Sequence, residues 1–179
     1  SNKLTFRLLH AKTRTEMKTE KLSFTESGTL TIKKVETKKD LNDFIQFPKK
    51  LYAKCPYYVT DLDRDIRNMF NPKKNAGLDF SEIQAFLAYD KQGKVMGRIV
   101  GIINHHANEK WETKNLRFGY FDFIDDIAVS KHLLNAVSQW GKEKGMVTIQ
   151  GPMGITDFDK EGMLIEDFDQ MGSMNTFYN

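Results

Sequence analysis

The stretch 117–154 constrains the fold more than any other part of this 179-residue chain, because its pattern predicts a strand, a helix and a second strand. Aromatic and β-branched residues fill 118–124, which is typical of a buried strand. Apolar residues then recur at helical spacing and predict one apolar helix face. They are Ile127, Leu133, Leu134, Val137 and Trp140. Gly145 is a natural residue to end the helix, and a strand over 147–150 stops at Gly151-Pro152. Such a unit crosses over between parallel strands, and open α/β sheets bind ligands at the carboxyl ends of their strands.

Two carboxylates stand between the first strand of this unit and its helix. Either Asp125 or Asp126 can cap the helix by accepting a hydrogen bond from a free backbone N–H. Because these residues and 151–154 follow the two strands, we expect any function to centre on this edge of the sheet.

The other predicted elements are, in order, a strand over 29–36, a helix over 38–53 capped by Thr37, a short helix over 61–70, a hairpin of strands over 83–89 and 95–103, and a polar loop over 104–114. Pro48 should kink or split the first helix, because proline removes one N–H and clashes with the preceding turn. In the second helix, Leu62, Ile66 and Met69 are predicted to face inward. The element order is therefore β-α-α-β-β-β-α-β, an α/β fold.

Charge and composition limit the partners. The net charge of +3 is carried by residues 1–29, so the rest of the chain is neutral and lacks the surplus of cations that a nucleic-acid site needs. No apolar run approaches the roughly 20 residues of a membrane span, so we expect no membrane partner. A single cysteine, Cys55, suits a reducing compartment, and we expect a cytoplasmic protein.

The chain is expected to form one domain with an arm. Residues 1–29 are rich in Lys, Thr, Glu and Ser, which favours an arm that is flexible or derived from cloning. The alternative is a β-arm that packs on a neighbouring chain through 21–24. Residues 30–179 form the domain.

Several short motifs, together with this element order, resemble the N-terminal part of the GNAT acetyltransferase fold. The motifs are Phe44-Ile45-Gln46-Phe47-Pro48 with Leu51-Tyr52, Pro72-Lys73-Lys74-Asn75, Gly97-Arg98-Ile99, Phe118-Gly119-Tyr120-Phe121-Asp122, Asp125-Asp126, Gly151-Pro152 and the stretch 162–169. The chain looks closest to an uncharacterised GNAT-like bacterial family, over 32–179. The resemblance implies a mixed sheet that lacks the family's C-terminal helix and two strands, and an acyl-CoA-dependent N-acyltransferase acting on an unknown amine. A second copy of the chain could complete such a sheet, so a homo-oligomer is a further expectation.

The resemblance also implies a place for acetyl-CoA or another acyl-CoA, between the strands that end at Ile124 and Gln150. The candidate cofactor-binding residues are Ile124, Asp126, Ile127, Ala128, Gln150 and Gly151. Family members hold the pyrophosphate on the N–H groups of a glycine-rich turn. This chain has no glycine over 124–129 and carries two carboxylates there, and like charges about 4 Å apart cost about 1–4 kcal/mol. The alternative function is therefore a non-catalytic GNAT-derived binding or assembly module that has lost coenzyme A binding.

Candidate catalytic and substrate residues follow from the same resemblance. Asp122 is a candidate general base, predicted to share a strand face with Tyr120 and Ile124, and the alternative is a solvated carboxylate. Tyr178 is the second catalytic candidate. Three acidic residues beyond the sheet edge would suit a cationic amine, or else form a solvated loop; they are Asp157, Glu161 and Asp169. No metal site is expected, because these carboxylates lack a recognised ligand spacing. The turn over 151–154 either binds an acyl carbonyl through its N–H groups or simply reverses the chain.

Overall fold

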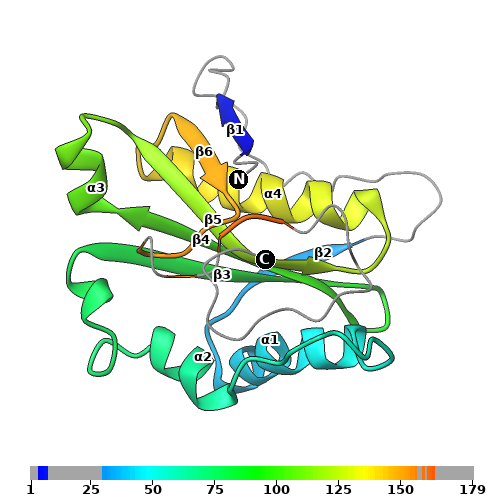
Figure 1. Cartoon of the computed structure of the whole chain (residues 1–179). Helices are drawn as coiled ribbons and strands as arrows, with labels where there is room; N and C mark the ends of the chain where they lie inside the picture. The colour runs from blue at the N-terminus through cyan, green and yellow to red at the C-terminus, as the bar shows by residue number, and fades with distance from the viewer. Residues whose placement is uncertain (1–3, 8–29, 157–158, 160, 164–179) are drawn as a thin grey trace.

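The computed structural model describes residues 4–7, 30–156, 159 and 161–163, and of 4–7 only the backbone. One central sheet separates two helical layers (Figure 1), with the long helix on one face and two shorter helices on the other. The elements are β1 (Leu4–Arg7), β2 (Thr31–Lys34), α1 (Lys38–Leu51), α2 (Asp63–Met69), a 3-10 turn over Ala76–Asp79, β3 (Ser81–Tyr89), β4 (Val95–Asn104), α3 (His105–Lys110), β5 (Asn115–Phe123), α4 (Ile127–Glu143) and β6 (Thr148–Gly151).

The sheet has six strands in the order β1-β6-β5-β4-β3-β2. The β5–β6 pair is parallel and joined through α4, and the other four neighbouring pairs are antiparallel. The α/β fold class, the β3–β4 hairpin and the strand–helix–strand unit are therefore confirmed. Strand β1 was not predicted. It pairs with β6 within the same chain, from Leu4 opposite Gly151 to Arg7 opposite Thr148, and so covers the edge of the sheet.

The core on the α4 face is built by residues that recur at helical spacing. Val129, Leu133, Val137 and Trp140 are buried against β4 and β5. Ile127 was predicted to belong to this stripe and does not, because 71% of it is exposed. It precedes Val129 by two residues, and two residues on a helix turn the side chain by about 200°, toward solvent. The helix ends as predicted, with Gly145 at φ +80°.

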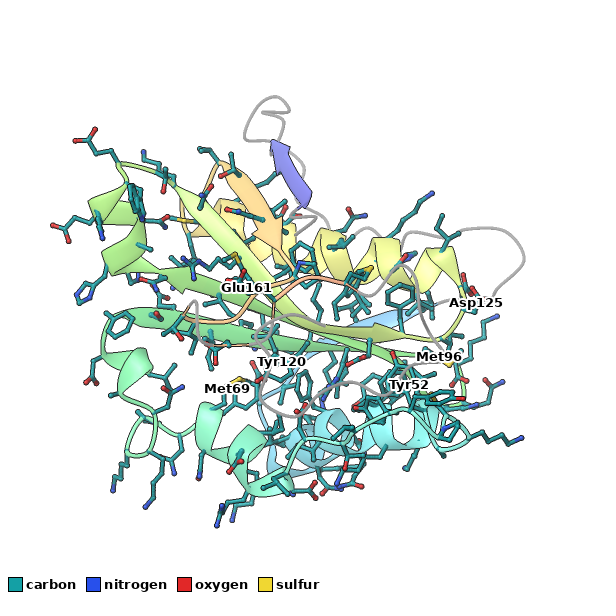
Figure 2. The ribbon with its side chains drawn as sticks, in the orientation of Figure 1. Tyr52, Met69, Met96, Tyr120, Asp125 and Glu161 are labelled. Carbon is teal, nitrogen blue, oxygen red and sulfur yellow. The ribbon has the colours of Figure 1, made fainter. Side chains whose placement is uncertain are left out.

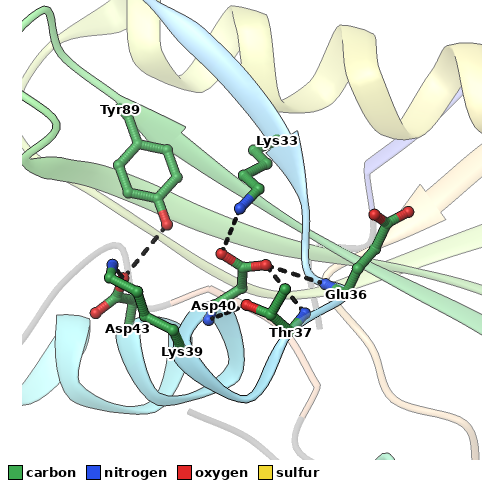
Figure 3. Close-up of polar contacts among 7 residues, drawn as sticks. All are labelled: Lys33, Glu36, Thr37, Lys39, Asp40, Asp43 and Tyr89. Carbon is green, nitrogen blue, oxygen red and sulfur yellow. Dashed lines mark hydrogen bonds and ion pairs between the residues drawn. The ribbon is translucent and has the colours of Figure 1, made fainter.

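The first helix begins as predicted at Thr37 (Figure 3). The Thr37 hydroxyl accepts a hydrogen bond from the Asp40 N–H at 3.1 Å, and the Asp40 carboxylate accepts one from the Thr37 N–H at 3.0 Å. Lys33 donates to the same carboxylate at 2.7 Å. This bond from Lys33 holds the pKa of Asp40, which is buried, well below its usual range.

Three local predictions were wrong. Pro48 does not split α1, which runs on to Leu51, because the proline lies in the last turn and interrupts a single helical bond. Leu62 does not face inward; it precedes α2 as its N-cap and is 62% exposed. The stretch predicted to be a loop contains α3, which starts where the Asn104 side chain accepts from the Ala107 N–H at 2.9 Å.

Strand β5 carries an irregularity that sets the direction of its side chains. Asp122 pairs with Arg98 and Gly119 with Val100, so β5 has one residue more than β4 between these pairs, as in a β-bulge. Tyr120 lies inside this bulge at φ +49°. Tyr120 packs against the α1 core, whereas Ile124 packs against the α4 core, so the predicted common face of these two residues is wrong.

Candidate active site

The candidate site lies where β4, β5 and the end of α1 meet, and Asp122 is at its centre. Arg98 on β4 donates from Nε to Asp122 Oδ2 at 2.7 Å, and the Tyr52 hydroxyl donates to Asp122 Oδ1 at 3.0 Å. Figure 2 shows Tyr52 at the end of α1, beneath the sheet. Both oxygens of the predicted base are thus engaged by donors that come from distant parts of the sequence.

The Arg98 side chain is 4% exposed and contacts further groups besides Asp122. Its Nη1 donates to the carbonyl oxygen of Phe44 at 3.0 Å. That carbonyl is available because residue 48, four positions later, is Pro48 and has no N–H to donate. The guanidinium carbon also lies 4.7 Å from the centre of the Phe44 ring and 5.6 Å from that of Tyr120. These contacts compensate for placing a charge in the interior.

Three tyrosines surround this ion pair and remain neutral at physiological pH. Burial, followed by the nearby Asp122 carboxylate, raises the pKa of Tyr58 to about 12 and raises that of Tyr52 well above its usual range. Burial raises the pKa of Tyr120 in the same way, with further contributions from the carboxylates of Asp61 and Asp159. The hydroxyls therefore stay protonated, and the negative charge is confined to carboxylates.

A small cavity opens between α1, α2 and the segment that joins them. Its volume is about 200 Å³, counting the space open to solvent at its mouth. It is lined by Ile45, Pro48, Lys49, Tyr58, Asp61, Ile66 and Arg98. The Tyr58 ring packs on that of Tyr52, with 4.5 Å between their centres. Most of this volume is open solvent, and the enclosed part has room for about one water molecule, far below the roughly 300–1,000 Å³ of a drug-sized site.

The start of α4 is the second predicted site, and the N–H of its second residue is already occupied. The Asp126 carboxylate accepts a hydrogen bond from the Ala128 N–H at 2.8 Å and caps the helix. Asp125 beside it is exposed and points away from the body of the molecule in Figure 2. This arrangement does not fit a pyrophosphate. One carboxylate stands where the phosphate anion would bind, a second lies next to it, and 124–129 contains no glycine.

The two parallel strands separate beyond the third residue pair. Their pairing runs from Asn115 opposite Thr148 to Arg117 opposite Gln150. The Met153 N–H then donates to the Phe118 carbonyl at 2.8 Å, so this N–H of the 151–154 turn is not available to an acyl group. The chain turns away after a cis Gly151-Pro152 bond, and among the described residues no strand pairs with 119–123 on this side.

Of the acidic residues after β6, the structure describes Asp159 and Glu161. Asp159 influences the pKa of Tyr120, so its carboxylate lies near that hydroxyl, and it also accepts from the Thr156 N–H at 2.8 Å. Glu161 is buried, 5% exposed. The other predicted residues, Asp157, Asp169 and Tyr178, lie outside the described residues. Sequence reasoning missed Arg98, Tyr52, Tyr58 and Asp61 as members of the site; the motif Gly97-Arg98-Ile99 was noted only for its resemblance.

The described residues contain neither a metal-binding cluster nor a membrane-spanning helix. Over 30–156, 159 and 161–163, no group of three or more His, Cys, Asp or Glu side chains is arranged to hold a metal ion. None of the helices found in this part of the chain combines the length and apolarity needed to cross a bilayer.

Comparison with known proteins gives relatives for most of the chain. Protein YghO of Escherichia coli K12 is 36% identical over 132 residues, which cover 74% of this chain and 33% of that protein. The bacterial ceramide synthase of Caulobacter vibrioides is 31% identical over 141 residues, which cover 78% of this chain and 36% of that protein. The chain thus spans about a third of the length of these relatives. No family model matches it.

Solved structures with a similar fold include a GNAT-family acetyltransferase from Staphylococcus aureus Mu50. The two are 15% identical, with a TM-score of 0.46, over 65% of this chain and 69% of the other. It belongs to the superfamily that the sequence resembles, and the likeness concerns the general fold.

Proposed function

We propose that this chain is part of an N-acyltransferase that acylates a long-chain amine, and that the cationic head group of the amine binds at the Arg98–Asp122–Tyr52 site. One observation carries the proposal: the Asp122 carboxylate is fixed by two donors beside a small cavity, on β5 just before the edge at which ligands of α/β sheets bind.

The cavity lining offers a primary ammonium group one carboxylate and one aromatic ring. Its two cations, Lys49 and Arg98, are each paired with an aspartate outside the lining. Asp61 and Tyr58 line the cavity together with Arg98, which holds Asp122 in place. A carboxylate attracts the cation, and an aromatic face adds a cation–π contact worth about 0.5–2 kcal/mol. Each oxygen of Asp122 accepts one bond from the protein and keeps a second lone pair for an ammonium N–H. The residues therefore bind and orient an amine.

The name of one relative indicates the kind of amine. A ceramide is the amide of a fatty acid and a long-chain amino alcohol, so a ceramide synthase forms an N-acyl bond on such an amine. Because the cavity is small and open to solvent, a long hydrocarbon chain would lie outside it.

A second candidate function is supported by the start of α4. There the Asp126 carboxylate occupies the place of the pyrophosphate of acyl-CoA, the acyl donor that the resemblance implies. This favours a GNAT-derived module that has lost coenzyme A binding and that works with the remainder of a longer protein.

A titration and a product assay distinguish the two candidate functions. This chain, and a protein of the relatives' full length, are titrated calorimetrically with palmitoyl-CoA and then incubated with sphinganine, with N-acylated product measured by mass spectrometry. We expect product from the longer protein, and a kcat/KM at least roughly tenfold lower for Asp122→Asn than for the matched exposed control Asp65→Asn, since tenfold corresponds to about 1.4 kcal/mol of transition-state binding.

Three results would be decisive. Product formation unaffected by Asp122→Asn would refute the proposed amine site. Palmitoyl-CoA binding to the longer protein alone, with product formation that depends on Asp122, would assign the acyl donor to the rest of that protein. No product from either protein would leave the binding module as the function.

A further inference from the structure

The segment from Cys55 to Leu62, which joins α1 to α2, presents apolar side chains to solvent at the mouth of the cavity. Tyr57, Val59 and Leu62 are 39%, 41% and 62% exposed. Between them, Tyr58 and Asp61 line the cavity. Tyr58 and Asp61 thus face inward, whereas the exposed side chains of the segment are mostly apolar, with Thr60 as the polar exception.

Backbone hydrogen bonds hold this segment in place. The Cys55 N–H donates to the Tyr52 carbonyl at 2.8 Å, and the Tyr58 N–H donates to the Cys55 carbonyl at 3.4 Å. The packed rings of Tyr52 and Tyr58 anchor its centre to α1. The outward direction of the three apolar side chains is therefore built into the fold, and three exposed apolar residues so close together are typical of an interaction surface.

The charge around the segment favours an anionic partner. Residues 49–67 contain five Lys or Arg and three Asp, a net charge of +2. Lys49 pairs with Asp63 on α2, whereas Lys50 and Lys54 are exposed and form no ion pair within the described part of the chain. Apolar and aromatic side chains beside free lysines are the combination that binds proteins to the surface of anionic bilayers.

We propose that the segment 55–62 docks on the surface of an anionic lipid bilayer, with Tyr57, Val59 and Leu62 in the interfacial layer and the mouth of the cavity facing the membrane. The expectation of no membrane partner rested on the lack of a spanning run, and surface docking needs none. The inference does not depend on acyl transfer, and lipid binding is measured without acyl donor or amine.

Vesicle flotation of the 179-residue chain tests the proposal. We expect binding to vesicles of phosphatidylglycerol and phosphatidylethanolamine, weaker binding to phosphatidylcholine alone, and a decrease with salt. The triple variant Tyr57→Ser, Val59→Ser, Leu62→Ser should bind about tenfold or more weakly, because burying even part of three apolar side chains exceeds the free energy of one tenfold step. The double variant Lys50→Glu, Lys54→Glu should bind anionic vesicles at low salt more weakly than the triple variant does.

The matched control is Trp111→Ser. Trp111 is 68% exposed and follows α3, which lies away from α1 and α2 in Figure 1, so its loss should leave vesicle binding unchanged. Urea unfolding checks that every variant keeps the stability of the parent chain. The proposal is overturned by absent binding, by undiminished binding of the triple variant, or by an equal loss in Trp111→Ser. It is also overturned if a protein of the relatives' full length fails to bind, because another part of that protein then covers the segment.

Discussion

The buried ion pair between Arg98 and Asp122 makes a sharp prediction about stability. Asp122→Asn keeps the volume of the side chain and removes its charge. The Arg98 side chain is 4% exposed, so its guanidinium would lose its charged partner and keep neutral ones, namely the new amide oxygen at position 122, the Phe44 carbonyl and two ring faces. Removing one partner of a buried pair costs about 3–5 kcal/mol, and we expect about 3 kcal/mol here because Asp122 itself is 19% exposed and partly hydrated.

Urea unfolding of the single and double variants separates the interaction energy of the ion pair from the effect of each substitution on packing. In a cycle with Arg98→Met, the coupling energy should be about 2 kcal/mol, at the upper part of the range for residues in contact. The control is the pair Lys39–Asp43 on α1, in which the lysine is 79% exposed, so solvent screening should make the coupling much smaller. A cost below about 1 kcal/mol for Asp122→Asn, or a coupling no larger than that of the control pair, would refute the reasoning.

Three further predictions concern the surrounding fold. The pKa of Asp40 is depressed in the folded state. The stabilising effect of Asp40 is therefore complete above the unfolded pKa of about 3.9 and declines as the pH falls below that value. The free energies of unfolding of the parent chain and of Asp40→Asn, measured with urea, should become equal toward about pH 2. Asp126→Ala removes the cap of α4 and should cost about 1 kcal/mol in urea unfolding, against less than about 0.5 kcal/mol for exposed Asp125→Ala. Gly119→Ala would bring a methyl group to 2.6 Å from the Met153 carbonyl oxygen, and calorimetry should show a loss of about 1–3 kcal/mol; an unchanged melting temperature would contradict this close approach.

The sequence predicted those parts of the fold in which neighbouring residues decide the outcome. The Thr37 cap, the β3–β4 hairpin and the end of α4 at Gly145 each depend on a few consecutive side chains. Prediction failed where long-range packing decides. The six residues of α3 have no apolar stripe that would predict a helix. The residues of β1 form a strand because they pair with β6 at the edge of the sheet.

The candidate site was predictable only in part, for the same reason. Asp122 stood out as a polar residue in an aromatic strand, and Asp126 as a cap before an apolar helix. The partners of Asp122 come from 24 and 70 residues away, and no local pattern links them to it. The bulge at Tyr120 further changed which side chains share a face, since one extra residue reverses the alternation beyond it.

Proline in α1 shows how one residue can connect the fold to the site. From the sequence, Pro48 is a defect, because the helix loses one hydrogen bond there. In the folded chain the carbonyl oxygen that loses this bond, on Phe44, accepts one from Arg98 instead. The same guanidinium holds Asp122, so the interruption of α1 helps to fix the charged group on the neighbouring sheet. A carboxylate fixed in this way, bonded to an arginine that lines a small cavity, is better suited to binding and orienting a cation than to moving freely as a solvated side chain.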